Sequence, residues 1–154
     1  ATRAWLALYW VNPLSEKDED FLKYSKLKPA FDLESTIIAI NEVSAWEYVW
    51  YWKHFQAKKD MKIWVIRFWY FEWLERTLNN YFFEFNRQKV YLVWKICMNM
   101  CMVDLTGIQA KVWDKISIIS LYWENNFNAL AKASNKIPYE IMVWINESIR
   151  REIY

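Results

Sequence analysis

Residues 108–130 read IQAKVWDKISIISLYWENNFNAL and decide the fold that the sequence predicts. Their apolar residues recur in steps of three or four, with a mean of about 3.67, which keeps one face of a straight α-helix apolar. The β-branched run at 116–119 alone would indicate a strand, but the longer period outweighs it. We therefore predict one long helix whose apolar stripe consists of Ile108, Val112, Ile116, Ile119, Trp123, Phe127 and Leu130.

Start signals for helices flank this stripe on both sides. Thr106-Gly107-Ile108-Gln109 fits a capping box, in which the Thr106 hydroxyl accepts from a helical amide and Gln109 reaches back. Downstream, residues 135–138 end in Pro138, which is tolerated in the first turn of a helix. A last helix is predicted there, with Ile141, Ile145, Ile149 and Ile153 as its apolar seam.

Prolines and capping residues divide the rest of the chain into further helices. Between residues 81 and 96 two interpretations stay open. The runs 81–85 and 89–94 could pair as a hairpin around Asn86-Arg87, but a helix from about 87 is preferred because Met and Leu are plentiful and Gly is missing. The other predicted helices cover residues 2–11, 15–28, 32–58, 61–78 and 87–104.

Glycine is nearly absent and aromatic residues are abundant. The 154 residues include one Gly, whereas an average chain of this length would have about eleven. Turns between strands often need positive φ, which Gly supplies, so its absence argues against sheets. With 12 Trp, 10 Tyr and 9 Phe, the core has ample apolar area. We predict an all-α fold, a compact bundle of six or seven mostly antiparallel helices in a single domain, residues 1–154.

The charge pattern argues against several classes of partner. The net charge is +2, and bases are mixed with acids along the chain, so no nucleic-acid partner is predicted. No run of 18 uncharged apolar residues occurs, so no transmembrane helix is predicted. The N-terminus shows no signal-peptide pattern. A membrane surface is an alternative partner but not the favoured one.

His54 is the only histidine and the only candidate for binding a cofactor. It could serve as an axial haem ligand inside a bundle. A di-iron site would need a Glu-x-x-His pair on each of two helices, and the sequence has none. The alternative is that His54 binds no ligand and is a partly exposed histidine near the end of a helix.

Cys97 and Cys101 are the candidate metal ligands. On a helix Cys97 and Cys101 share one face and Met98 and Met102 the next, and such soft sulfur ligands suit a thiophilic metal. The alternative is ordinary core packing. Two cysteines at this spacing on a helix would not form a disulfide, which is compatible with a reducing compartment.

No activity is legible in the sequence. It lacks a Gly-rich phosphate loop, and one histidine leaves few ways to build acid–base catalysis, so no enzyme and no cofactor are predicted. The favoured function is a non-catalytic structural or assembly protein that binds itself or a protein partner through aromatic and apolar helix faces. Its skewed composition is typical of an artificial sequence. It would also fit a sequence of uncertain identity, in which residue types were assigned from side-chain size in a density map. The alternatives are a binder of a planar apolar ligand such as haem or a pigment, and a peripheral membrane or membrane-complex subunit.

Overall fold

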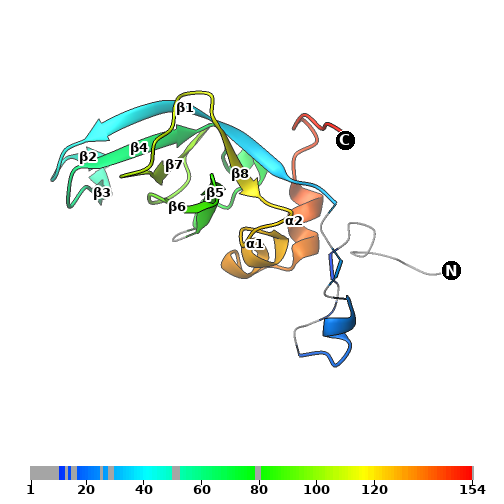
Figure 1. The fold of residues 1–154 in the computed structure, drawn as a ribbon. Coiled ribbons are helices and arrows are strands. Elements are labelled where there is room, and N and C mark those ends of the chain that lie inside the picture. The colour runs from blue at the N-terminus through cyan, green and yellow to red at the C-terminus, as the bar shows by residue number, and fades with distance from the viewer. Residues whose placement is uncertain are drawn as a thin grey trace.

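Six antiparallel strands form a closed barrel in the order β1-β4-β7-β6-β5-β8 (Figure 1). This computed structural model describes residues 11–12, 14, 17–24, 26–27, 30–49, 53–78 and 81–153. The barrel strands are β1 (Leu33–Val43), β4 (Met61–Ile66), β5 (Phe82–Phe85), β6 (Gln88–Leu92), β7 (Cys101–Asp104) and β8 (Lys115–Ile119). A separate two-stranded ribbon pairs β2 (Tyr48–Val49) with β3 (Phe55–Gln56).

The prediction of an all-α bundle of six or seven helices is therefore wrong. The described residues contain two short α-helices, α1 (Phe127–Ala133) and α2 (Pro138–Trp144), and the 3-10 turns η2 (Phe21–Tyr24) and η4 (Tyr70–Glu72). The two α-helices pack together at one end of the barrel, and the β2-β3 ribbon lies at the other (Figure 1). Among the described residues, no helix is long and apolar enough to cross a membrane.

Residues 108–130, predicted as one helix, contain a series of turns, the strand β8 and the start of α1. In β8 the side chains of Ile116 and Ile118 both point into the core, which is the period of two expected of a strand. In α1, Phe127 and Leu130 are buried. The apparent helical stripe thus joins the inner face of a strand to the inner face of a separate short helix.

The predicted capping box at residues 106–109 is also wrong. Thr106 donates through both its backbone N–H and its hydroxyl to the Asp104 carboxylate, at 2.9 and 2.6 Å. The Ile108 N–H donates to the Leu105 carbonyl at 2.9 Å, which closes a β-turn with Gly107 at φ +85°. The one glycine of the chain therefore serves a turn of the sheet.

The hairpin interpretation of residues 81–96 is correct, and the preferred helix is wrong. β5 and β6 pair antiparallel with Phe85 opposite Gln88, and both turn residues, Asn86 and Arg87, have positive φ. Such a two-residue turn matches the twist of the flanking strands. Buried and half-buried side chains alternate along β5, with Phe83 and Phe85 inside.

The other predicted helices have different outcomes. Residues 32–58 form β1 to β3 in their described part, 61–78 form β4 and η4, and 87–104 form β6 and β7. The described part of 15–28 contains only the short η2. The helix predicted at 2–11 lies outside the described residues, apart from residue 11. The last helix begins at Pro138 as predicted but ends at Trp144, so most of its predicted seam lies beyond it.

Inward side chains from all six strands fill the barrel and continue beneath the two helices. The Trp64 and Phe85 rings meet edge to face, with centroids 5.2 Å apart. At the helical end, Phe31 packs edge to face on Phe127 at 4.9 Å. Barrel and helices thus share one apolar core, which fixes the helices and the connections beside them against the barrel.

Candidate functional site

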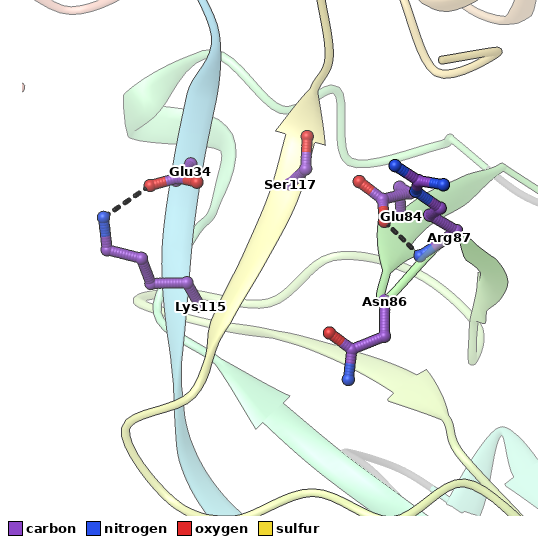
Figure 2. A pocket seen from close by; sticks show the side chains of 6 residues that line it. All are labelled: Glu34, Glu84, Asn86, Arg87, Lys115 and Ser117. Atoms are coloured by element: carbon purple, nitrogen blue, oxygen red, sulfur yellow. Dashed lines mark hydrogen bonds and ion pairs between the residues drawn. The ribbon is translucent and has the colours of Figure 1, made fainter. Parts of the chain in front are cut away.

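A polar cleft of about 470 Å³ lies where β5 meets β8 and closes the barrel (Figure 2). The Lys115 ammonium lies 2.7 Å from the Glu34 carboxylate, and Glu84 accepts a hydrogen bond from the Arg87 backbone N–H. Two acidic and two basic side chains line the cleft, so its formal charge is balanced. It is lined by Glu34, Glu84, Asn86, Arg87, Lys115 and Ser117.

A second candidate is the η4 loop, residues 67–78, which connects β4 to β5. Its turn is closed by hydrogen bonds from the Trp73 N–H to the Tyr70 carbonyl and from the Leu74 N–H to the Trp69 carbonyl, both 3.2 Å. The Glu72 carboxylate accepts from the Trp69 N–H at 3.1 Å. This network holds the short turn in one conformation, so the side chains that it projects are held in place.

Contacts from three directions fix the η4 loop. The Asn146 side chain, just beyond α2, donates to the Phe71 carbonyl at 3.2 Å. The Lys136 ammonium lies 4.0 Å from the Glu75 carboxylate. On the barrel side, the Ile96 N–H donates to the Arg76 carbonyl at 3.2 Å. The loop is thus held between the helices and the connection from β6 to β7.

The exposed face of this loop presents groups that can hold a proton. Tyr70 is 44% and Phe71 59% exposed, while Glu72 is half-buried. Burial raises the pKa of the Glu72 carboxyl, and the hydrogen bond from Trp69 and the charge of Arg67 oppose that shift. We call Tyr70, Phe71 and Glu72 the η4 edge.

Cys97 and Cys101, the predicted metal ligands, are both buried and free. Cys101 begins β7, and Cys97 precedes it in a turn closed by the Cys97 N–H and the Met100 carbonyl at 3.0 Å. Within the described part of the chain, no three His, Cys, Asp or Glu side chains gather as a metal site would need. Binding of a soft metal by the cysteine pair stays a prediction.

Both thiols are expected to be unreactive in the native protein. Burial raises the pKa of Cys97 and of Cys101, and the nearby Glu72 carboxylate raises that of Cys101 further. Because the thiolate is the reactive form, a raised pKa lowers its fraction at pH 8. An aromatic disulfide reagent should label neither thiol at an appreciable rate before unfolding, and both in guanidinium. Rapid labelling of Cys101 in the folded state would contradict its burial.

His54, the predicted cofactor ligand, is exposed just before β3. Its ring is stacked near the Trp94 ring, with centroids 6.3 Å apart. The helical bundle that was to enclose a planar ligand around His54 does not exist in the described residues. Neither the cysteines nor His54 belongs to the cleft or to the η4 edge.

Tyr70, Phe71 and Glu72 were not predicted as part of a functional site. Residues 61–78 were predicted to form one helix. The available signal was the group Tyr70-Phe71-Glu72, with its hydroxyl and its carboxylate, separated by three residues from a strand-like run at 61–66. A connection that follows a strand is a common place for functional side chains.

Comparison with known proteins identifies the family. Residues 30–153 match the family model described as alanine racemase, C-terminal domain. The chain is 33% identical to the alanine racemase of Aquifex pyrophilus over 150 residues, 97% of this chain and 42% of the relative. It therefore spans less than half of the curated relatives that it matches.

Solved structures agree with the barrel. Alanine racemase from E. faecalis superposes with a TM-score of 0.84 at 25% identity, over 96% of this chain and 39% of that one. The Bartonella henselae enzyme, solved with covalently bound pyridoxal phosphate, gives 0.79 at 23% identity, over 92% and 38%. The latter likeness supports the fold alone.

These matches overturn the predicted function. A non-catalytic structural or assembly protein, an artificial sequence, a haem or pigment binder and a membrane subunit are all wrong, because the relatives are natural isomerases. The prediction that the protein is not an enzyme is wrong for the same reason, since the relatives that it matches are alanine racemases. The family match covers residues 30–153, and the barrel superposes on solved members. This chain belongs to the alanine racemase C-terminal domain family.

Proposed function

We propose that this chain is the C-terminal domain of an alanine racemase and acts together with a part equivalent to the remainder of its relatives. The family match over residues 30–153 and the 33% identity to the Aquifex pyrophilus enzyme support the proposal. The substrate is then alanine, and the reaction interconverts its two enantiomers.

Racemisation removes the proton from the α-carbon of alanine and returns one to the opposite face. Such a reaction needs groups that hold and donate protons on both sides of the carbon, fixed by rigid elements. Within the described residues, the η4 edge meets this need best. The observation that carries the proposal is the Tyr70 hydroxyl, which projects from a turn held by hydrogen bonds and by its neighbours on three sides.

Pyridoxal phosphate is the cofactor that the Bartonella henselae structure implies, and it supplies an electron sink for the carbanion. The described residues do not fit it. The cleft between β5 and β8 is balanced in charge, so it offers no excess of positive charge to the cofactor phosphate. The cofactor would therefore be held by the part of the enzyme that this chain lacks. The described residues would contribute proton transfer and enclosure.

The sequence predicted that the chain binds itself or a protein partner. We propose that this partner belongs to the same enzyme, as a second copy or as another part of it. Tyr70 and Phe71 leave much of their surface exposed on the η4 edge. An active site must exclude water to make its electrostatic interactions effective, so another protein surface has to cover this edge. The proposed binding surface is therefore this edge, and not the aromatic helix faces predicted from the sequence.

The test is the activity of the complete gene product that contains this chain. With pyridoxal phosphate supplied, it should convert L-alanine to D-alanine, measured by an enantiomer-specific oxidase. The same preparation stripped of pyridoxal phosphate serves as the control and should be inactive. A folded protein that binds the cofactor but forms no D-alanine would contradict the proposal.

A further inference from the structure

Tryptophan occupies an unusual share of the strained backbone positions. Nine non-glycine residues have positive φ among the described residues, and four of them are tryptophans. Eight of the 12 tryptophans are described, so half of these lie at positive φ, whereas no described Phe or Tyr does. A bulky side chain at positive φ is a genuine outlier. The four are Trp46 (φ 71°), Trp73 (98°), Trp94 (66°) and Trp113 (78°).

Two of these tryptophans lie in turns of the same kind as the turn of Gly107. The turns 44–47, 105–108 and 111–114 are each closed by a hydrogen bond from the fourth N–H to the first carbonyl, at 3.1, 2.9 and 3.1 Å. In each, the third residue has positive φ, as a type II turn requires: Trp46, Gly107 and Trp113. Glycine is the residue normally found there. Trp46 and Trp113 are 69% and 73% exposed, so little packing offsets their strain.

Trp73 occupies a third glycine position, at the end of η4. The Leu74 N–H reaches back to the Trp69 carbonyl while the Trp73 N–H reaches the Tyr70 carbonyl. These two bonds define a Schellman motif, whose left-handed residue is usually glycine because it lacks Cβ. Trp73 is that left-handed residue.

The amino-acid composition also suggests that tryptophan stands where glycine is expected. Together the 12 Trp and the one Gly make up 13 of 154 residues, close to the share of about 7% that glycine alone has in an average chain. One cause acting on many positions would explain both the missing glycine and the excess of tryptophan. The codon UGA is such a cause, since some genetic codes read it as tryptophan and others as glycine.

We propose that positions 46, 73, 94 and 113 are glycine in the protein made by its natural host, specified by UGA codons that this host reads as glycine. The backbone then has its normal residue in two type II turns and in the Schellman motif beside Tyr70. This inference concerns the residues of the chain and is independent of the proposed racemase activity.

Peptide mass spectrometry of the protein isolated from its natural host tests the proposal. Trypsin releases residues 68–76, 90–95 and 112–115 as separate peptides that contain Trp73, Trp94 and Trp113. Each should have a mass lower by the difference between a tryptophan and a glycine for every such position. The peptide 96–111 contains Gly107 and no tryptophan, so its mass should match the sequence. Peptides that retain tryptophan at these positions would overturn the proposal.

A stability measurement tests separately whether tryptophan at positive φ strains the backbone. The chain carrying Trp46→Gly and Trp113→Gly should unfold at a higher urea concentration than the chain with tryptophan at both positions. Tyr91→Gly is the matched control, since Tyr91 is an aromatic residue on β6, 49% exposed and absent from the positive-φ positions; its midpoint should fall. A double variant with a lowered or unchanged midpoint would contradict the strain on which the proposal rests.

Discussion

Phe83→Ala is expected to destabilise the chain by about 3–5 kcal/mol, the usual range for removing a buried aromatic side chain. Phe83 is fully buried at the centre of β5, in the core that all six strands share. Its removal leaves a cavity that the closed barrel cannot collapse to fill, since β5 is bonded on both sides, to β6 and to β8. Urea unfolding followed by circular dichroism would measure the loss.

Phe82→Ala is the matched control for this prediction. Phe82 is adjacent in sequence but points to the other face of β5, where it is half-buried against Tyr91 and beneath the Lys89 ammonium. We expect a clearly smaller loss than for Phe83→Ala. Equal losses at the two positions would contradict the alternation of a strand.

Tyr70→Phe is expected to lower the rate of alanine racemisation by about 10²- to 10⁴-fold, the usual contribution of one acid–base group. The substitution removes only the hydroxyl. It leaves the hydrogen bonds of the η4 turn, which involve backbone groups of Tyr70, Trp73 and Leu74 and the Glu72 side chain, in place. The complete enzyme should therefore fold and bind its cofactor normally while kcat falls.

Tyr91→Phe provides the control for the loss of a hydroxyl. Tyr91 is similarly exposed, at 49% against 44%, but lies on strand β6 away from the η4 turn in sequence. Its racemisation rate should match that of the unmodified enzyme. A Tyr70→Phe enzyme with an unchanged rate would exclude the hydroxyl from proton transfer, and a loss of cofactor binding would assign Tyr70 to a structural role.

Local signals predicted the parts of the fold that depend on few residues. Pro138 marked the first turn of α2 because its ring fits only there in a helix. The apolar runs on either side of Asn86-Arg87 indicated a hairpin, which the structure contains, although the helix was preferred. Both features are decided by neighbours in sequence.

The barrel could not be predicted because the signals for its turns were hidden. Strand connections need residues with positive φ, and four such positions carry Trp46, Trp73, Trp94 and Trp113. Trp113 lies in the turn just before β8, so without a glycine there the predicted helical stripe continued through that turn into β8. The strand period of two at Ile116 and Ile118 was present, but it covered too few residues to outweigh the longer helical period.

The candidate site was hidden for a different reason. The η4 edge is assembled by contacts between distant residues, such as Asn146 with Phe71 and Ile96 with Arg76. Neither contact follows a spacing rule. The residues that looked chemical, His54 and the cysteine pair, attracted attention because of their type, but His54 stacks near Trp94 and both thiols are buried.

Contacts between backbone protons, measured by nuclear magnetic resonance, test most directly that residues 108–130 help to close a barrel. The fold predicts cross-strand contacts between Ser35 and Ile116 and between Glu84 and Ser117, which join β8 to its two neighbours. It also predicts that an unbroken series of amide–amide contacts between successive residues begins only at about Phe127, with isolated contacts of this kind in the turns before β8. An unbroken series of such contacts from Ile108 to Leu130, without the cross-strand pairs, would contradict the barrel.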